Sequence, residues 1–273
     1  MSMKLIQGDC LEVMKTLPDN SVDLTVTSPP YDNLRTYNGY VFNFEGIAKQ
    51  LYRVTRKGGV VVWVVGDATI KGSETGTSFK QALYFKDVCG FNLHDTMIYR
   101  KKSNYAHDPR NKRYKAIFEY MFIFSKGTPQ TYNEIKDNPN IHAGKRYSGG
   151  KGRNNKGQLR SSIDFIIQPF QARYNIWKIT TDHNSEHPAI FPEKLARDHI
   201  ISWSNEGDTV LDPMMGSGTT GKMARILNRK FIGIEISTEY FNIATRRIED
   251  TDPLFQAVEV MTVENMKKGR VGN

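Results

Sequence analysis

The sequence predicts an α/β protein built on a mostly parallel sheet. Three features of the 273 residues support this fold class. Short apolar and β-branched runs alternate with segments of helical spacing, as is typical of a parallel sheet covered by helices. One such run ends in a Gly-x-Gly turn and another in Pro-Pro, so two strands lead into turns of the kind that carry ligand sites. The hydrophobic content of 38% and the charged content of 25% are those of a folded domain.

The periodicity places seven strands and six helices along the chain. The predicted strands cover residues Lys4–Gln7, Val22–Thr27, Val60–Val65, Met97–Tyr99, Tyr120–Phe124, Thr209–Asp212 and Phe231–Ile236. The predicted helices cover residues Cys10–Leu17, Phe44–Arg56, Ser78–Val88, Pro192–Ser204, Gly218–Leu227 and Thr238–Glu249. The continuous apolar run Val60–Val65 is typical of a strand that is buried on both faces.

Positive charge is concentrated in the middle of the chain. The whole sequence has a formal charge of +9 and a pI near 9.4. Residues 100–178 hold 17 Lys and Arg against 5 Asp and Glu, a net charge of +12, so the remainder is slightly acidic at −3. A basic stretch of this size predicts a polyanionic partner, of which nucleic acid is the leading candidate. Within it, Gly144–Arg160 is glycine-rich and nearly free of apolar residues, and we expect a mobile loop there.

A glycine turn follows the strand that ends at Asp212. The order of a buried strand, an acid, Gly216-Ser217-Gly218 and a helix lets the backbone approach a ligand closely. Glu235, 23 residues after Asp212, ends the next strand, where ribose hydroxyls lie in nucleoside-binding folds. A simple tight turn is the alternative. Gly221 falls one position too early for the dinucleotide pattern, which argues against a nicotinamide oxidoreductase.

A rigid corner, Ser28-Pro29-Pro30-Tyr31, follows the strand Val22–Thr27. The two prolines fix φ and remove two N–H donors, so nearby carbonyls have few local partners. The corner presents a hydroxyl, carbonyls and an aromatic ring at the carboxyl end of a strand, where open α/β sheets bind ligands. Taken alone, such a corner can also be only a turn.

Several classes of protein are disfavoured. Cys10 and Cys89 form neither a disulfide framework nor a zinc motif, and we expect both to be reduced thiols in a cytoplasmic protein. No signal peptide is recognisable, and Val60–Val65 is far too short to cross a membrane. His183 and His187 have i, i+4 spacing without a third ligand, so we expect no metal site.

The two motifs together resemble those of the circularly permuted beta group of DNA amino-methyltransferases, which act on cytosine N4 or adenine N6. In that family the [Asp/Asn/Ser]-Pro-Pro-[Tyr/Phe] motif comes first, a target-recognition region follows, and the glycine-containing cofactor motif comes last. This chain has the same order over most of its length. The resemblance implies a Rossmann-like S-adenosylmethionine-dependent methyltransferase fold, with a mostly parallel seven-stranded sheet and an inserted basic region.

The resemblance also implies domain limits and site residues. It divides the chain into a catalytic half (1–99), a basic target-recognition region (100–182) that includes part of the catalytic sheet near 117–126, and a cofactor-binding half (183–273). Its catalytic residues are Ser28, Pro29, Pro30 and Tyr31. Its cofactor-binding residues are Asp9, Thr27, His187, Pro188, Phe191, Asp212, Pro213, Gly216, Ser217, Gly218, Thr219, Glu235 and Ile236. Asp9, which would meet the adenine amino group, can also cap the helix beginning at Cys10.

The implied reaction is methyl transfer to an exocyclic amine. The amine is a poor nucleophile, and hydrogen bonds from it to the Ser28 hydroxyl and the Pro29 carbonyl would favour a tetrahedral, attacking nitrogen. Tyr31 would stack on a base flipped out of the duplex. Neither cysteine follows a proline, as the nucleophile for cytosine C5 does. Serine in the first motif position favours cytosine N4, since aspartate is commoner in adenine enzymes. Adenine N6 remains the alternative.

The resemblance implies duplex DNA as the partner. The expected DNA contacts are Arg100, Lys101, Lys102, Arg110, Lys112, Arg113, Lys145, Arg146, Lys151, Arg153, Lys156 and Arg160. Restriction–modification is the implied setting, with or without a cognate restriction endonuclease, and both a monomer and a homodimer stay open. An RNA methyltransferase, or a nucleic-acid-binding protein without catalysis, is a lower alternative.

Overall fold

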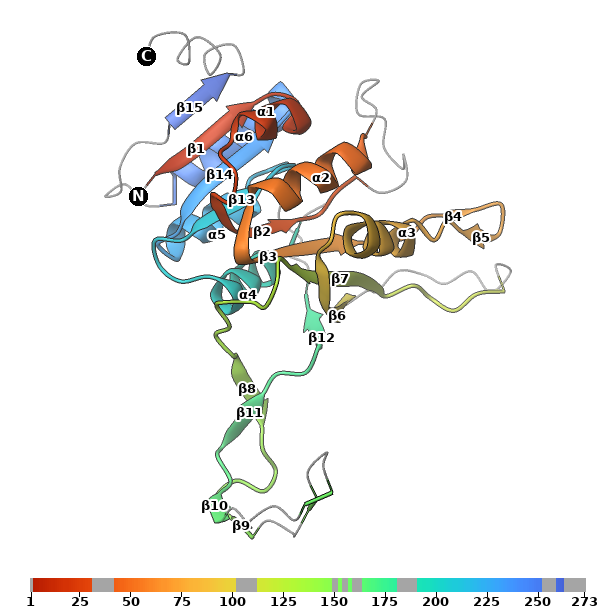
Figure 1. The fold of residues 1–273 in the computed structure, drawn as a ribbon, viewed down its shortest axis with the longest axis vertical. Helices are drawn as coiled ribbons and strands as arrows, with labels where there is room; N and C mark the ends of the chain where they lie inside the picture. Colours follow the sequence, from red (N-terminus) through yellow and green to blue (C-terminus); the bar gives the residue numbers. More distant parts are fainter. Residues whose placement is uncertain are drawn as a thin grey trace. The chain divides into compact units, whose positions relative to one another are not determined.

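One large sheet with helices on both faces forms the main part of the protein (Figure 1). The computed structural model describes residues 2–30, 42–101, 112–148, 152–153, 157–158, 164–180, 191–251 and 259–262. The chain divides into two compact units, the first made of Met1–Asn133 and Asn175–Asn273 and the second of Glu134–Tyr174. The second unit lies within the basic region expected at 100–182.

The main sheet has nine strands among the described residues, and eight of them run in the same direction. In spatial order they are β12 (Ile176–Ile179), β6 (Asn92–Lys101), β7 (Phe118–Ser125), β3 (Thr55–Val65), β2 (Val22–Thr27), β13 (Thr209–Asp212), β14 (Lys230–Glu235), β1 (Met3–Gln7) and β15 (Glu259–Thr262). Only β7 is antiparallel to its neighbours. The seven strands expected from the sequence are all present, and β12 and β15 are added at the two edges.

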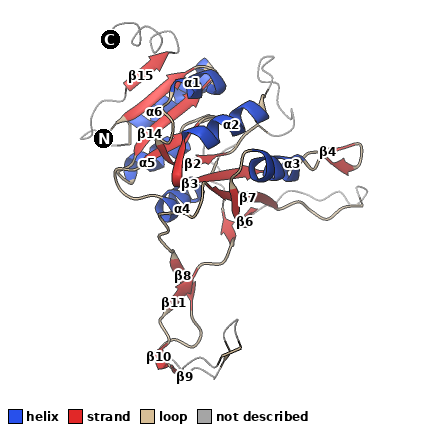
Figure 2. Ribbon diagram, in the orientation of Figure 1, coloured by secondary structure: helices blue, strands red, loops and turns tan. Residues whose placement is uncertain are grey.

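Six α-helices, together with one π-helical turn, cover the sheet in the described part of the chain (Figure 2). They are α1 (Cys10–Thr16), α2 (Phe44–Val54), α3 (Thr77–Leu83) with the π-helical turn η1 (Tyr84–Val88), α4 (Glu193–Trp203), α5 (Thr219–Ile226) and α6 (Thr238–Glu249). One apolar core joins one sheet face to α4, α5 and α6. A second core joins the other face to α1, α2, α3 and η1. The protein therefore has three layers in its main unit.

The apolar runs of the sequence become strands because both sheet faces are covered. In β3, Val60, Val62 and Val64 belong to the core below α4–α6, whereas Val61, Trp63 and Val65 belong to the core below α1–α3. All six are at most 1% exposed. A strand buried on both sides has no polar face, which explains why Val60–Val65 shows no alternation.

The order of strands explains how the two sequence motifs meet. β13 and β14 come late in the chain but lie between β2 and β1, which come first. The carboxyl ends of β2, β13, β14 and β1 are therefore neighbours along one edge of the sheet. This arrangement is the permuted order that the resemblance implied.

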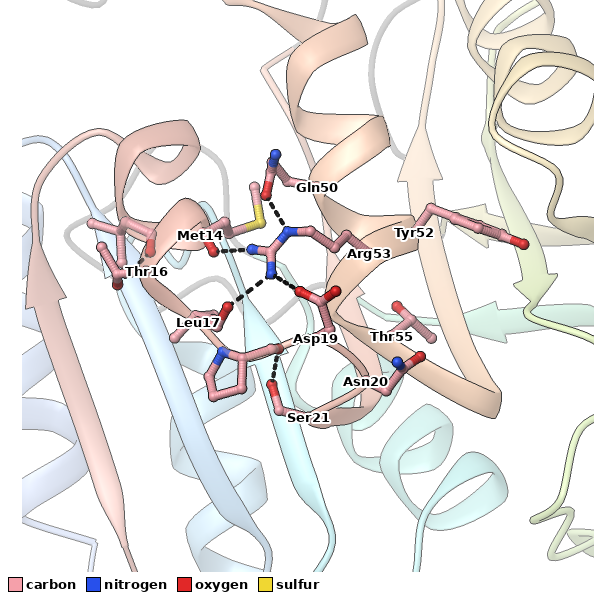
Figure 3. A network of polar contacts seen from close by, with 12 residues as sticks. Met14, Thr16, Leu17, Asp19, Asn20, Ser21, Gln50, Tyr52, Arg53 and Thr55 are labelled. Atoms are coloured by element: carbon pink, nitrogen blue, oxygen red, sulfur yellow. Dashed lines mark hydrogen bonds and ion pairs between the residues drawn. The ribbon is translucent and has the colours of Figure 1, made fainter.

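The helix pair α1 and α2 is joined by one arginine (Figure 3). Arg53 of α2 donates to the carbonyls of Leu17, at 2.9 Å, and Met14, at 2.6 Å, where α1 ends. The same guanidinium forms an ion pair with Asp19 and donates to Gln50. Carbonyls at a helix end have few partners within the helix, and Arg53 adds a charged donor to the Leu17 carbonyl and to the Met14 carbonyl, which also accepts from the Leu17 amide. This contact fixes α1 and the turn after it.

Several predicted boundaries shift in the structure. The helix predicted over Phe44–Arg56 ends at Val54, because β3 begins at Thr55 and the Lys126 ammonium binds the carbonyls of Tyr52 and Thr55. The helix predicted over Ser78–Val88 is α-helical only to Leu83. Its last turn is π-helical, and it places the buried Phe85 against Trp63 and Phe124.

The second unit consists of short antiparallel ladders. In it β8 (Lys136–Pro139) pairs with β11 (Phe170–Ala172), and β9 (Arg146–Ser148) pairs with β10 (Asp164–Ile166). The expectation of a loop over Gly144–Arg160 is therefore wrong at Arg146–Ser148. Short polar strands have no apolar alternation, so the sequence pattern does not reveal them. In the main unit, β4 (Thr69–Ile70) and β5 (Ser73–Glu74) form a hairpin.

Candidate functional site

Two proposed motifs, the corner and the glycine turn, lie beside each other at the carboxyl edge of the sheet. β2 and β13 pair in parallel, with Leu211 beside Thr25. At the ends of these strands the Thr27 hydroxyl donates to Asp212 Oδ1 at 2.8 Å. Both side chains are buried: Thr27 is 0% exposed and Asp212 is 5% exposed. This bond joins the corner to the glycine turn across 185 residues of sequence.

Asp212 is a carboxyl group that is buried away from water. Burial raises its pKa to about 6, and hydrogen bonds from Thr27 and from the Met214 amide oppose that shift. Nearby Glu235 adds a smaller upward contribution to the pKa. A buried carboxylate of this kind favours a cationic or hydrogen-bond-donating ligand, because such a ligand replaces the interactions with water that the carboxylate loses on burial.

The glycine turn has an open side and a packed side. Gly216 has φ +50°, and a Cβ added there would meet no atom within 4 Å. Gly218 has φ +80°, and a Cβ there would lie 2.9 Å from the Cβ of Ala244 in α6. The first glycine therefore leaves space for a ligand to approach the backbone, and the second allows α6 to pack closely.

Glu235 holds the same turn from the neighbouring strand. Its Oε2 accepts from the Gly216 amide at 2.9 Å, and its Oε1 accepts from the Ser237 amide at 2.9 Å. The side chain is 8% exposed, and burial raises its pKa, although these backbone bonds lower it. Glu235 thus ends β14 where the sequence placed it, and Ile236, 41% exposed, follows it.

Asp9 lies at the next strand end. Gly8 donates to the Glu235 carbonyl at 2.9 Å, so the residue after it is close to β14. Asp9 Oδ1 accepts from the amides of Leu11, at 2.7 Å, and Glu12, at 3.3 Å. The structure therefore shows Asp9 as the N-cap of α1, one of the two roles that the sequence left open. Its second carboxylate oxygen is not used in these cap bonds.

The described part of the corner is partly buried. Pro29 is buried, and Ser28 and Pro30 are half-buried. A cavity of about 340 Å³ adjoins Pro30 and has aromatic walls from Phe42, Phe44 and Tyr84. Its walls come from separate segments, so no sequence pattern pointed to this cavity. The lining also includes Glu45, Lys80 and Gln81, so the walls are polar as well as aromatic.

Some proposed site residues lie outside the described residues. They are Tyr31, His187 and Pro188. Phe191 is described, is partly buried and packs against the core below α4–α6. Pro213, Ser217 and Thr219 are buried in or beside the glycine turn. The helix predicted from Gly218 begins at Thr219, with Gly218 as its N-cap residue.

The proposed DNA-contacting residues are spread over both units. Those outside the described residues are Lys102, Arg110, Lys151, Lys156 and Arg160. Those described are Arg100 and Lys101 at the end of β6, Lys112 and Arg113 before β7, and Lys145, Arg146 and Arg153 around β9. All but Lys101 are exposed. Three of them form ion pairs, Lys101 with Glu119, Arg113 with Glu74 and Arg146 with Asp164.

One residue near the glycine turn was not singled out by the sequence. Arg247, in the last turn of α6, donates to the Ser217 carbonyl and to the Ser217 hydroxyl, both at 2.7 Å. A basic residue in a last helical turn is usually explained by the helix dipole. Its distance of 30 residues from Ser217 gives no local pattern that could have found it.

The residues at this edge fit S-adenosylmethionine, the cofactor that the sequence implied. Two buried carboxyl groups, Asp212 and Glu235, face a turn whose Gly216 is open. These acceptor groups suit a ligand with a sulfonium, an ammonium and ribose hydroxyls. In the described residues no group of three His, Cys, Asp or Glu could hold a metal ion. None of the helices described is both long and apolar enough to cross a membrane.

Comparison with known proteins gives closely related sequences and folds. M.BamHII of Bacillus amyloliquefaciens, an orphan methyltransferase, is 56% identical over 255 residues, which cover 90% of this chain and 95% of that protein. TTHA0409 of Thermus thermophilus, a candidate DNA modification methylase solved in complex with S-adenosyl-L-methionine, has a TM-score of 0.66 at 24% identity and covers 95% of this chain and 98% of that one.

A second solved structure has the same fold. The PvuII DNA methyltransferase, which is cytosine-N4-specific, has a TM-score of 0.67 at 21% identity, covering 98% of this chain and 91% of that chain. These structural matches confirm the predicted methyltransferase fold. The N6/N4 methyltransferase family model, described as DNA methylase, matches residues 22–246. This match and the identity to M.BamHII confirm the predicted resemblance, and the chain belongs to the N6/N4 DNA methylase family.

Proposed function

We propose that the protein transfers a methyl group from S-adenosylmethionine to the exocyclic N4 amine of cytosine, at a specific site in duplex DNA. The observation that carries this proposal is the bond between Thr27 and Asp212, at 2.8 Å. It sets the corner that begins at Ser28 beside the glycine turn that begins after Asp212. The proposed site for the amine and the proposed site for the methyl donor are therefore neighbours.

The cofactor would be held by the residues at the ends of β13, β14 and β1. Asp212 and the turn Gly216–Gly218 would face its methionine part, Glu235 would accept from the ribose hydroxyls, and Asp9 would accept from the adenine amine. S-adenosylmethionine supplies a methyl group already activated by the positive sulfur. The support from the structure is the burial of both Asp212 and Glu235 and the open position at Gly216.

The corner would orient and activate the target amine. The Ser28 hydroxyl and the Pro29 carbonyl would accept its N–H protons and favour a tetrahedral nitrogen aligned with the methyl group. Tyr31 would stack on the flipped base. The cavity beside Pro30, with aromatic walls from Phe42 and Phe44, supports the idea that a planar group leaves the duplex and binds here.

Cytosine N4 is preferred over adenine N6 because of Ser28. A hydroxyl is a weaker acceptor than the aspartate common in adenine enzymes, and it can also engage the ring N3 of cytosine. The likeness to the PvuII enzyme is one of fold and adds no support for the base. An N6-adenine methyltransferase with the same residues in the same roles is the second candidate.

Digestion of methylated DNA separates the two candidates. The purified protein is incubated with duplex DNA of varied sequence and S-adenosylmethionine, and the nucleosides are identified by mass spectrometry. N4-methyldeoxycytidine is the expected product. N6-methyldeoxyadenosine would keep the site and reject the base assignment. Absence of any methylated deoxynucleoside, while the cofactor binds, would point to RNA or to binding without catalysis.

The proposal extends to the setting of the enzyme. We propose a cytoplasmic enzyme that binds duplex DNA through its basic region, as a monomer or a homodimer. The relative M.BamHII is an orphan methyltransferase, so action without a cognate restriction endonuclease belongs to this proposal as well as action beside one. Sedimentation with and without duplex DNA would distinguish the two oligomeric states.

A further inference from the structure

We propose that Arg247 is a positioning residue for the cofactor, because it binds the glycine turn from α6 whereas Glu235 binds it from β14. This inference rests on the proposed function, since it assigns a part of the same site. It concerns a side chain that comes from the last turn of α6 and lies outside both sequence motifs.

The glycine turn needs an external support. Ser217 lies between Gly216 at φ +50° and Gly218 at φ +80°. Glycine has the widest conformational freedom of any residue, so two glycines on either side of Ser217 leave its peptide groups free to reorient. A site that binds its ligand through backbone groups must hold those groups in one orientation before the ligand arrives.

Arg247 provides that support at the centre of the turn. Its Nη1 lies 2.7 Å from the Ser217 carbonyl oxygen, 2.7 Å from Ser217 Oγ and 3.4 Å from Thr219 Oγ1. Charged donors make stronger bonds than neutral ones, and a planar guanidinium fixes direction as well as distance. Ser217 is 8% exposed and Thr219 is 3% exposed, so water has little access to compete for these acceptors.

Opposite charges hold two neighbouring backbone groups of the turn. Glu235 accepts from the Gly216 amide at 2.9 Å, and Arg247 donates to the carbonyl of the next residue, Ser217. α6 is pressed against the turn at Gly218, where Ala244 leaves no space for a Cβ. Ala244 and Arg247 are three positions apart on one helix face, so packing and charge act from the same side.

The guanidinium also reaches the start of α4. Its Nη2 lies 3.2 Å from Oε1 of Glu193, which is the first residue of α4. Lys222 of α5 binds the same carboxylate oxygen at 2.7 Å. Glu193 comes two residues after Phe191, which the resemblance places on the methionine side of the cofactor. Arg247 therefore links both segments that are proposed to surround the methionine part of the cofactor.

The test uses Arg247→Met, with Arg246→Met as the matched control. Arg246 is the preceding residue of the same helix, is exposed, and donates only to the Asn242 carbonyl within α6 among the described residues. Both variants lose one positive charge and keep a long side chain. Calorimetry with S-adenosylmethionine, followed by methyl transfer at varied cofactor and DNA concentrations, measures the effect.

Arg247→Met should raise the Kd and the KM for S-adenosylmethionine by about tenfold, which is the loss typical for a charged hydrogen bond. At saturating cofactor, kcat and the KM for DNA should stay within about threefold of wild type. Arg246→Met should leave the cofactor Kd unchanged. Arg247→Lys should recover part of the affinity, because an ammonium can still donate to Ser217. General damage to the fold would give no such split and no such recovery.

Glu193→Gln is a milder variant that removes the negative charge bound by Nη2 of Arg247. It should weaken cofactor binding by about threefold, and the double variant with Arg247→Met should lose no more than Arg247→Met alone. An unchanged cofactor Kd in folded Arg247→Met, or equal losses at Arg246 and Arg247, would overturn the inference. A wild-type protein that does not bind S-adenosylmethionine at all would instead reject the proposed function.

Discussion

The buried carboxyl of Asp212 makes the site sensitive to pH. Burial raises its pKa to about 6, from an ordinary value of 3.8. The native state therefore holds this proton more tightly than the unfolded chain does. The stabilising contribution of this group is present at low pH and is lost as pH rises through about 6. Binding of a cation to Asp212 has the opposite pH dependence, since it requires the ionised carboxylate.

The first prediction follows from that sign. Affinity for S-adenosylmethionine should decrease as pH falls below about 6, because protonation removes the negative charge of Asp212, which is proposed to face the cofactor. Asp212→Asn should bind more weakly at neutral pH and should lose this pH dependence. Calorimetry between about pH 5 and pH 8, a range that brackets that pKa, measures both effects. An unchanged slope in Asp212→Asn would assign the titration to Glu235 instead, whose pKa is also raised by burial.

The second prediction concerns the packed side of the glycine turn. Gly218→Ala should destabilise the fold by about 3 kcal/mol, because it adds an overlap with Ala244 to the cost of a positive φ. Gly207→Ala is the matched control. Gly207 has φ +85°, but a Cβ there meets nothing within 4 Å, so the cost should be about 1 kcal/mol. Urea unfolding of both variants gives the comparison. Equal losses would mean that α6 does not press on the turn.

At the scale of the elements, Arg53 connects two helices that the sequence predicted separately (Figure 3). Arg53→Ala should lower the free energy of unfolding by about 2 kcal/mol, because two carbonyls at the end of α1 lose a charged donor. The control is Lys15→Ala, which breaks an exposed i, i+3 pair with Glu12 and should cost about 0.3 kcal/mol. Similar losses from the two variants in urea unfolding would contradict this account of Arg53.

The strands and helices of the main unit could be predicted because their burial is reflected in the sequence. Val22–Thr27 and Thr209–Asp212 were predicted with their observed bounds, since β-branched runs and turn residues mark both ends. The end of α2 at Val54 could not be predicted, because it depends on Lys126, which is distant in the sequence. The edge strands β12 and β15 are short and follow from pairing with neighbours that the local pattern does not identify.

Residues of the candidate site that belong to a sequence motif could be predicted. Contacts that depend on how distant segments pack together could not. Asp212, Glu235 and Gly216 stand at strand ends and in a turn that the sequence shows directly. The bond between Thr27 and Asp212 depends on the permuted strand order, which places β13 beside β2. The contact of Arg247 with Ser217 depends on the packing of α6, and no local pattern indicates it.

For the whole molecule, the uneven distribution of charge predicts that salt affects the binding of DNA and the binding of the cofactor differently. Affinity for duplex DNA should fall steeply as salt increases, whereas affinity for the cofactor should change little. Lys145→Ala and Arg146→Ala should each reduce the slope of log K against log salt by about 1. The control is Lys86→Ala in η1, outside the basic stretch, where the slope should not change. Fluorescence anisotropy with a labelled duplex measures these slopes, and equal slopes in all variants would remove the basic region from the interface.

The corner at Ser28 and the glycine turn after Asp212 are proposed to form one methyl-transfer site. The most direct measurement follows a labelled methyl group from S-adenosylmethionine into duplex DNA, with wild-type protein and with Ser28→Ala. We expect the wild type to label the DNA, and Ser28→Ala to lose about a hundredfold in kcat while binding the cofactor within about threefold of wild type. Equal rates in the two proteins, or no labelled DNA from a wild type that binds the cofactor, would contradict the account.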